Sequence, residues 1–415
     1  MTPSRKAAIK KSTIKKPVTT KKVVRKSAKT ATKQKTATKS IGEQSLRIHK
    51  KLRGKIAVIP KARVASKADL SVYYTPGVGA VSLFLAKHKD KTREYTIKSN
   101  TVAVVSDGSA VLGLGNIGPE GALPVMEGKA MLFKALAGVD AFPIVLATQD
   151  TQAIIETVKH IAPGFGGINL EDIAAPRCFE IEARLKEELP IPVMHDDQHG
   201  TALVVLAGLI NALKVVKKHP HQVRIVVSGA GAAGQAITKL LLLFGVGDIL
   251  VVDSRGILSP SRRDLDRHKL EIVQLTNKEN RTGTLQDAFV SSDVFIGVSK
   301  GGTVKKEDIA RMNKQPIVFA LANPVAEIMP DEAKAGGAAV VATGRSDFEN
   351  QINNSLGFPG IFRGALDHGV RDITDEMLLA AAKKLAALVK RPVAKMIIPN
   401  TFDPRVAKAV ASAIR

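Results

Sequence analysis

One glycine-rich turn between two apolar segments constrains the fold of this chain more than any other feature. Residues 223–228 are mostly apolar, residues 229–234 read Gly-Ala-Gly-Ala-Ala-Gly, and residues 235–244 continue without a helix breaker. A second apolar run, 248–253, ends in Asp253. Strand, glycine turn, helix, strand and acid in this order are typical of a Rossmann-type dinucleotide-binding unit in a parallel sheet.

The glycines of the turn have separate roles in this interpretation. Gly229 permits the tight turn, Gly231 lets a pyrophosphate approach the backbone, and Gly234 lets the helix pack on the strand. The turn residues predicted to bind the cofactor are Gly229, Gly231, Ala232, Ala233 and Gly234. Asp253 is expected to hydrogen-bond the adenosine ribose and to repel a 2′-phosphate, so NAD is favoured. Arg255 would weaken that preference towards NADP.

Two later apolar runs, 294–298 and 317–321, predict further strands of the same sheet. Ligands of an open parallel sheet bind beyond the carboxyl ends of its strands. Asn323 follows the second run and is therefore predicted to meet the nicotinamide or the substrate. Asn353 and Asn354, in a loop further along, are similar candidates.

A second glycine motif, at 113–118, has dinucleotide-binding spacing but is interpreted differently. The apolar run 101–106 predicts a buried strand before it, while Pro119 and Pro124 are expected to delay the next helix to about Glu127. A dinucleotide site needs a helix N-terminus directly after its glycines. The motif is therefore predicted not to bind a dinucleotide.

Two residues in the N-terminal half of the chain, Lys129 and Tyr74, each have two possible interpretations. Lys129 is expected in the first turn of an apolar helix, either on the surface or buried with the lowered pKa that a general base requires. Tyr74 begins a Tyr-Thr-Pro-Gly-Val-Gly loop. It is either a packing residue or a proton donor.

Two acidic pairs have apolar neighbours, which argues against simple surface positions. Glu171-Asp172 and Asp196-Asp197 each lie at a predicted strand or helix end. Carboxylate oxygens of this kind suit Mg²⁺ or Mn²⁺. The alternative is that an aspartate of the second pair caps the helix predicted for 201–216.

Positive charge is concentrated at the N-terminus. Residues 1–42 hold 14 of the 62 Lys and Arg and none of the 38 Asp and Glu. This segment cannot offset its ordering entropy by burying apolar surface, so it is predicted to be disordered. Three roles stay open: non-specific binding of nucleic acid or another polyanion, a solvated tail, and an organelle transit peptide.

The rest of the chain is long enough for two domains. The single cysteine, Cys178, excludes an intrachain disulfide and fits a reducing compartment. Apolar runs such as 240–252 are interrupted well before the roughly 18 residues of a membrane helix. A cytoplasmic protein without a membrane span is therefore expected.

Together the motifs resemble the malic enzyme family in its short prokaryotic form, from about residue 45 to 415. They are, in order, Tyr74-Thr-Pro-Gly-Val-Gly, Leu112-Gly-Leu-Gly-Asn-Ile-Gly, Glu127-Gly-Lys129, Asn169-Leu-Glu171-Asp172, His195-Asp-Asp197-Gln-His-Gly-Thr, Gly229 to Gly234, Ala322-Asn323-Pro324 and Asn353-Asn354. The resemblance implies oxidative decarboxylation of L-malate to pyruvate and CO₂ with reduction of NAD or NADP, dependent on Mg²⁺ or Mn²⁺. It also implies a homodimer or larger homo-oligomer.

The resemblance assigns roles to individual residues. The implied metal ligands are Glu171, Asp172 and Asp197. The implied substrate-binding residues are Asn323, Asn353 and Asn354. Lys129, neutral before reaction, would take the C2 hydroxyl proton, and Asp196 would orient or tune it. Tyr74 would protonate C3 of enolpyruvate, in a site of its own subunit or of a neighbour.

One loop departs from the pattern of the larger eukaryotic members, which carry a substrate-binding arginine where this chain has Ala110. Lys91 is a candidate replacement. Two other hypotheses remain: a dehydrogenase that oxidises malate or a related 2-hydroxy acid without decarboxylation, and a polyanion-associated protein whose Rossmann core is a redox sensor or scaffold.

The expected fold is α/β, with a doubly wound parallel sheet of Rossmann type and a second α/β domain for the substrate. The expected organisation is a disordered tail (1–42), a substrate and metal domain (43–197), an NAD-binding domain (198–353) and C-terminal helices (354–415) that pack back on the substrate domain.

Overall fold

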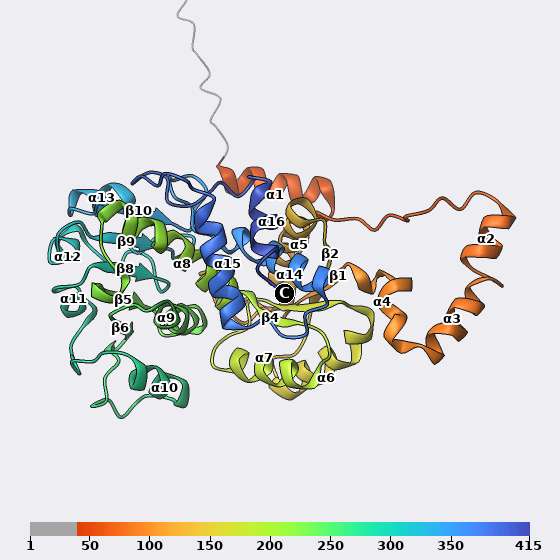
Figure 1. Ribbon diagram of the computed structural model, residues 1–415, viewed down its shortest axis with the longest axis horizontal. Helices are drawn as coiled ribbons and strands as arrows, with labels where there is room; N and C mark the ends of the chain where they lie inside the picture. The colour runs from red at the N-terminus through yellow and green to blue at the C-terminus, as the bar shows by residue number, and fades with distance from the viewer. Residues whose placement is uncertain (1–39) are drawn as a thin grey trace, which may run out of the picture. The chain divides into compact units, whose positions relative to one another are not determined.

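The computed structural model describes residues 40–415 (Figure 1). Two compact units are distinguished, residues 1–51 and residues 52–415. From Ile41 onwards, the described part of the first unit belongs to helix α1 (Ile41–Leu52). The predicted tail lies outside the described residues up to residue 39. The elements described below belong to the second unit.

The first sheet contains four parallel strands in the order β2-β1-β3-β4. They are β1 (Thr101–Ser106), β2 (Asp140–Val145), β3 (Gly167–Leu170) and β4 (Val193–His195). The connecting helices are α5 (Gly118–Ala137), α6 (Thr151–Ile161) and α7 (Arg177–Glu188). Leu170 is in register with His195, so the segments that follow β3 and β4 leave the same edge of the sheet side by side.

The second sheet has the order β10-β9-β8-β5-β6-β7. Its strands are β5 (Arg224–Ser228), β6 (Asp248–Asp253), β7 (Gly256–Ile257), β8 (Val294–Gly297), β9 (Ile317–Ala320) and β10 (Val340–Thr343). All pairs are parallel except β6 with β7. Helices α9 (Ala232–Phe244), α10 (Arg267–Leu275), α11 (Leu285–Ala288), α12 (Lys306–Ile309) and α13 (Pro330–Ala335) connect the strands. Strand order reverses between β5 and β8, which is the doubly wound pattern predicted from the glycine turn.

Helix α8 (Asp196–Val216) links the two sheets and packs against α9. By length and composition it could cross a membrane, but most of its apolar window is buried inside the protein, as in a core helix. It begins at Asp196, five residues earlier than predicted, because both aspartates take helical positions in its first turn. Negative side chains are favourable there, next to the free N–H groups.

Three C-terminal helices complete the unit: α14 (Phe358–His368), α15 (Asp375–Ala387) and α16 (Arg405–Ala411). Helix α14 packs on α5 and α16, and α15 packs on α8 (Figure 1). The rings of Phe133 and Phe358 meet edge to face, 4.7 Å apart, where α5 and α14 cross. The C-terminal segment therefore packs against elements of both sheets.

The helix expected to begin near Glu127 begins at Gly118, so that part of the prediction was wrong. Pro119 lies in the first turn, where a helix needs no N–H, and the helix continues past Pro124. Ala122 and Met126, which lie before and after Pro124 in the helix, are both buried. Their burial outweighs the cost of placing Pro124 inside the helix.

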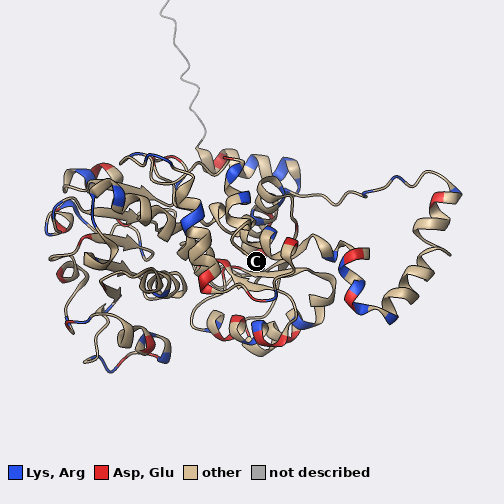
Figure 2. Ribbon diagram, viewed as in Figure 1, with Lys and Arg blue, Asp and Glu red and all other residues tan. Residues whose placement is uncertain are grey.

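Helices α2 (Lys67–Tyr73) and α3 (Val78–Lys87) pack on each other and contain no buried residue. We call residues 67–87 the arm. The short helix α4 (Thr92–Tyr95) follows and also contains no buried residue. In Figure 2 the arm is tan over most of its length, since α3 carries a single charged residue, Lys87.

Candidate active site

A carboxylate cluster lies where β3 and β4 end. Glu171, Asp172 and Asp197 each offer an oxygen, and these oxygens lie within 4.8 Å of one another. Glu171 and Asp172 are buried, and the Asp197 side chain is one-third exposed. The cluster follows from the sheet, because the parallel register brings the ends of neighbouring strands together.

The donor set fits a hard divalent cation. Burial raises the pKa of all three carboxyl groups and neighbouring carboxylates raise it further, while Lys129 acts in the opposite direction. One lysine therefore does not neutralise the cluster. The buried Oδ2 of Asp172 also has no hydrogen-bond partner among residues 40–415. Oxygen donors alone, with excess negative charge, are the environment that Mg²⁺ and Mn²⁺ prefer.

Lys129 projects from α5 into this cluster and is 7% exposed. Its Nζ lies 2.6 Å from Glu171 Oε1 and 2.6 Å from Asp196 Oδ2, and 4.2 Å from the centre of the Phe358 ring. Of the two interpretations left open, the buried one is therefore confirmed. Lys129 is the twelfth residue of α5 and therefore does not lie in its first turn.

The lowered pKa expected of a buried lysine is contradicted. Burial alone would lower the pKa of Lys129, but the charges of Asp196, Glu171 and Asp197 outweigh it and raise the pKa above its ordinary value. The ammonium form is thus the stable one beside these carboxylates. Sequence reasoning considered burial without the charges that tertiary contacts add.

The turn that carries Asp196 and Asp197 is fixed from two sides. A Cβ at position 200 would collide with the carboxyl of Asp196, so only glycine leaves room for it. On the other side the buried carboxylate of Glu182 accepts hydrogen bonds from the backbone N–H of His195 at 2.8 Å and from Gln198 Nε2 at 2.9 Å. Glu182 was not predicted from the sequence, because its local segment contains no motif that indicates a site.

His199 completes the contacts of Glu182, with its Nε2 at 3.0 Å. Burial alone would raise the pKa of Glu182, but the charge and hydrogen bond of His199 and the N–H of His195 lower it to about 2. The carboxylate is therefore ionised at neutral pH and supports the turn as an acceptor.

The asparagines predicted to bind substrate lie on two elements, the loop after β9 and the segment before α14. Asn353 caps the short helix η5 (Asn354–Leu356) by accepting the N–H of Ser355 at 3.0 Å. Helix η5 packs on α8 and leads directly into Phe358, whose ring contacts Lys129. Asn323 is half-buried in the loop after β9, and its Nδ2 donates weakly to its neighbour Leu321 O at 3.5 Å.

The glycine motif at 113–118 meets the loop that follows β9 of the second sheet. A Cβ at Gly113 would collide with the carbonyl oxygen of Asn323. Because no side chain stands between them, the loop of the first sheet closes on the loop that follows β9. That this motif does not bind a dinucleotide stays a prediction, and its stated reason, a delayed helix, is wrong because α5 begins at Gly118.

The predicted cofactor turn has the geometry expected of it. Gly229 has φ +118°, a conformation that side chains rarely adopt, and a Cβ at Gly234 would collide with the carbonyl oxygen of Gly229. Space is open around Gly231, as the approach of a pyrophosphate requires. Ala232 and Ala233 begin α9, so the free N–H groups of its first turn face this space.

Asp253 ends β6 as predicted, but its carboxylate is already engaged. Arg262 Nη1 lies 2.7 Å from Asp253 Oδ1, and Lys269 Nζ lies 2.9 Å from Oδ2. Burial opposes ionisation, yet these hydrogen bonds lower the pKa of Asp253 to about 2. The guanidinium of Arg255 instead bonds Asp264 at 2.9 Å. Arg262 and Lys269 were missed because a folded loop, not sequence spacing, brings them to the acid.

Tyr74 is not brought to the cluster within the described chain. It lies in the arm with 66% of its surface exposed. Lys91, the suggested replacement for an arginine, is exposed and pairs with Glu94 at 2.8 Å. Arg177 of α7 is the cation that reaches the loop containing Ala110, with Nη2 3.0 Å from Asp107 Oδ2. Sequence analysis missed it because it lies 70 residues away.

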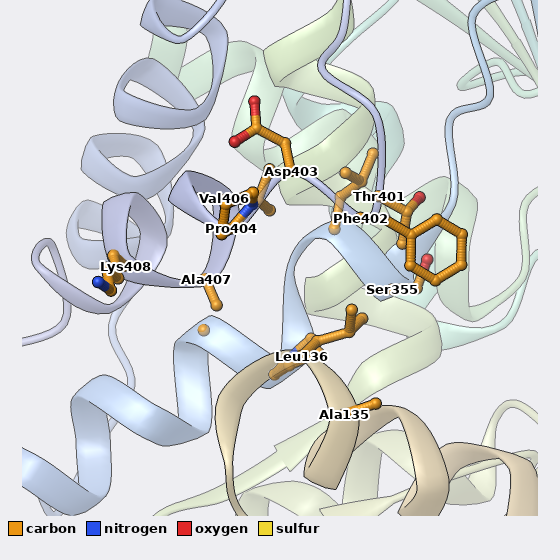
Figure 3. Close-up of a pocket in the computed structure, with 13 residues that line it drawn as sticks. Ala135, Leu136, Ser355, Thr401, Phe402, Asp403, Pro404, Val406, Ala407 and Lys408 are labelled. Carbon is orange, nitrogen blue, oxygen red and sulfur yellow. The ribbon is translucent and has the colours of Figure 1, made fainter.

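Two cavities lie outside the cluster. A cavity of about 370 Å³ between the end of α5, α14 and α16 is lined mainly by aliphatic groups, with Asp403 and Lys408 at its border (Figure 3). Another of about 610 Å³ borders α7, α9 and α15 and includes Glu182 and His199. None of the predicted metal ligands or cofactor-binding residues lines either cavity.

Comparison with known proteins agrees with this geometry. Residues 53–186 match the family model of the malic enzyme N-terminal domain, and residues 198–414 match that of the malic enzyme NAD-binding domain. The bifunctional malic/malolactic enzyme of Bacillus subtilis is 54% identical over 90% of this chain and 92% of its own length. The NAD-dependent malic enzyme of Geobacillus stearothermophilus is 56% identical over 87% of this chain and 76% of its own.

A solved structure extends the likeness to three dimensions. The NAD-dependent malic enzyme of Thermotoga maritima superposes with a TM-score of 0.86 at 51% identity, over 89% of this chain and 98% of that one. Both halves of the chain, the carboxylate cluster and the glycine turn thus lie within a shared architecture. The chain belongs to the malic enzyme family.

Proposed function

We propose that the carboxylate cluster, Lys129 and the glycine turn carry out the family reaction, oxidative decarboxylation of L-malate to pyruvate and CO₂. The observation that supports this most directly is the position of Lys129 Nζ, 2.6 Å from both Glu171 and Asp196. When bound, a divalent cation at Glu171, Asp172 and Asp197 would supply Lewis-acid polarisation and NAD would accept a hydride.

Lys129 takes the C2 hydroxyl proton in this proposal. Because its pKa is raised, Lys129 begins in the ammonium form. It must therefore pass a proton to a neighbour before it can act as a base. Asp196 is the neighbour that can hold one, since burial raises the pKa of its carboxyl to about 7. The pair would therefore act as one proton-handling unit, with Asp196 returning the lysine to its basic form.

The remaining residues are proposed to bind the substrate and to carry out the last proton transfer. Asn323, Asn353 and Asn354 are proposed to hold the substrate carboxylates and oxygens. Tyr74 is proposed to deliver a proton to C3 after CO₂ leaves, which a phenol can do when it is held close to the carbon.

Turnover with L-malate, Mn²⁺ and either NAD or NADP tests this function, with pyruvate and lactate measured in parallel. Pyruvate should appear in step with reduced cofactor and stop when EDTA removes the metal. Reduced cofactor without pyruvate would favour a dehydrogenase that does not decarboxylate. Lactate is included because the Bacillus subtilis relative is named a malic/malolactic enzyme.

We further propose that the arm docks on a second copy of the chain, forming a homodimer or larger homo-oligomer. Leu83 is 69% exposed, Val72 67% and Tyr73 55%, although all are apolar or aromatic. Helices of 7 and 10 residues are too short to be stable without tertiary packing. Since Tyr74 lies in this arm, the same docking would bring it to the neighbour's carboxylate cluster.

Light scattering coupled to size exclusion tests the docking. Leu83→Glu should convert the protein to monomers, because a charge would be buried in the interface. Leu270→Glu on α10 is the matched control, since Leu270 is also exposed, at 45%, and lies in the other half of the chain. A wild-type monomer, or an unchanged mass for Leu83→Glu, would contradict the proposal.

The remaining assignments are proposals that rest on sequence. Residues 1–42 are proposed to bind nucleic acid or another polyanion, and the cytoplasm is proposed as the location. Domain boundaries at 42, 197 and 353 are proposed with them. Deleting residues 1–39 should abolish salt-sensitive binding to duplex DNA and leave turnover unchanged.

A further inference from the structure

A buried carboxylate joins the two loops that follow β8 and β9. The β8 loop is residues 298–304, and the β9 loop is residues 321–327. Glu327 is fully buried. Its Oε1 accepts the backbone N–H of Ser299 at 2.9 Å, and its Oε2 accepts the backbone N–H of Ala322 at 3.1 Å.

Backbone contacts hold the two loops around this carboxylate. Gly302 N–H donates to Ala326 O at 3.0 Å, and Val304 N–H donates to Glu327 O at 3.1 Å. A Cβ at Gly297 would collide with the Glu327 carboxyl, and one at Gly301 would collide with Val325. The small residues thus allow the close approach that both hydrogen bonds need.

The charge of Glu327 is balanced by backbone alone. Burial raises the pKa of Glu327, and in the described part of the chain the groups that lower it are the N–H groups of Ser299, Ala322 and Glu327 itself. A carboxylate kept from water without a cationic partner is costly to the fold. A hydrophobic side chain would fill the space at lower cost, so the benefit lies in what the two acceptors hold.

The two acceptors hold loops at the carboxyl ends of β8 and β9, and ligands of an open parallel sheet bind at this edge. Ser299 Oγ lies 3.0 Å from the Oγ of Ser228, the last residue before the glycine turn. Ala322 directly precedes Asn323, whose carbonyl packs against Gly113 of the other sheet. Glu327 is therefore the link in a continuous path from the glycine turn to the substrate-side loop.

We propose that Glu327 is a positioning residue that ties the β8 and β9 loops into one platform for the nicotinamide half of the cofactor. The proposal rests on the proposed function for its effect on turnover, but not for its effect on cofactor binding. Both carboxylate oxygens are required, because each accepts from a different loop. The adenosine half binds further along the sheet, at Asp253, and is independent of this platform.

Glu327→Gln removes one acceptor at nearly constant shape, since an amide nitrogen cannot accept a hydrogen bond. Calorimetry should show an NADH Kd raised about tenfold, the cost of one lost hydrogen bond to a charged group. ADP-ribose, which lacks the nicotinamide, should bind the variant with less than about a twofold change in Kd. With L-malate, kcat should fall together with the rise in the KM for NAD.

Asp293→Asn is the matched control. Asp293 is also buried and accepts a backbone N–H, from Arg224 at 2.9 Å, but it lies at the opposite end of β8. This variant should lower the unfolding temperature and leave both ligand Kd values unchanged. Equal weakening of NADH and ADP-ribose by Glu327→Gln, or no weakening of either, would overturn the proposal.

Hydrogen exchange on the wild-type protein supplies a test that no folding defect can obscure. The amides of Ser299 and Ala322 should exchange slowly and more slowly still with NADH, while the exposed amide of Lys300 exchanges fast. Fast exchange at Ser299 or Ala322 would overturn the proposal. If wild-type protein fails to oxidise malate, the proposed function fails, whereas the NADH and ADP-ribose comparison still decides the role of Glu327.

Discussion

Lys129 Nζ lies 2.6 Å from Asp196 Oδ2, and this contact joins two buried side chains that are 67 positions apart in the sequence. Helix α5 supplies the cation and the first turn of α8 supplies the anion. Because both side chains are buried, solvent has little access to the contact between them. The proton chemistry proposed above depends on this contact.

Lys129→Met should lower kcat by about 10³-fold, because a methionine side chain cannot accept the proton. Binding of Mn²⁺ should become tighter, since the carboxylates lose the cation that competes for their charge. Lys134→Met on the same helix is the control, as Lys134 is 63% exposed and pairs with Asp140, outside the cluster. Steady-state kinetics and Mn²⁺ binding followed by electron paramagnetic resonance measure both effects. Weaker Mn²⁺ binding would assign Lys129 a structural role instead.

Asp172→Asn should weaken Mn²⁺ binding by about 100-fold or more, since one charged ligand of three is lost. Turnover at saturating Mn²⁺ should recover only in part. Glu180→Gln on α7, where the side chain is 59% exposed, controls for the general loss of a negative charge. Equal metal affinity in Asp172→Asn and wild type would remove Asp172 from the ligand set.

Mixing two inactive variants, Tyr74→Phe and Lys129→Met, tests where Tyr74 acts. If the arm serves the neighbour's site, a mixed dimer has one site with both native residues, and activity returns to roughly a quarter of wild type after random exchange of subunits. If each chain completes its own site, every site in the mixture lacks one residue and stays inactive. Kinetics after co-refolding or co-expression distinguish the two outcomes.

Asp253→Ser should shift cofactor preference from NAD towards NADP by about 100-fold in the ratio of kcat/KM values, or about 2.7 kcal/mol. The change removes the carboxylate that repels a 2′-phosphate and frees Arg262 and Lys269 to bind it. Arg255→Ala should change the ratio little, because its guanidinium bonds Asp264. A large effect of Arg255→Ala would restore that residue as the determinant.

Glu182 should make the fold sensitive to acid. Its pKa of about 2 lies below the ordinary value of 4.5, so its ionised form contributes stability that is present above about pH 4.5 and is lost as the pH falls towards 2. Wild type should therefore exceed Glu182→Gln in unfolding free energy at pH 7, by up to about 3 kcal/mol, and the difference should shrink in that window. Urea denaturation at a series of pH values measures it. A difference that is constant with pH would contradict this explanation.

Short segments of sequence were sufficient to predict those features that depend only on neighbouring residues. Gly229 to Gly234 specify their turn through backbone conformation and close packing, and the strands on either side follow from apolar runs. The predicted Rossmann-type sheet and the grouping of Glu171 with Asp172 were obtained in this way, as was the expectation of an α/β fold with two sheets.

Predictions failed where the structure depends on contacts between residues that are far apart in the sequence. Pro119 and Pro124 suggested a late helix, yet burial of one face of α5 begins it at Gly118. Spacing pointed to Arg255, whereas the folded loop brings Arg262 and Lys269 to Asp253. Neither outcome is encoded within a short window of sequence.

The sequence by itself determined the family, the two-sheet architecture, the glycine turn and the identity of the carboxylates, because turn conformation, apolar periodicity and ordered motifs are properties of neighbouring residues. Only the tertiary structure decided the charge state of Lys129 and the hydrogen bonds of Asp253. The same holds for the joining of the β8 and β9 loops by Glu327 and for the exposure of Tyr74. Each of these depends on which groups lie within a few ångströms, and electrostatic energies inside a protein change steeply over that distance.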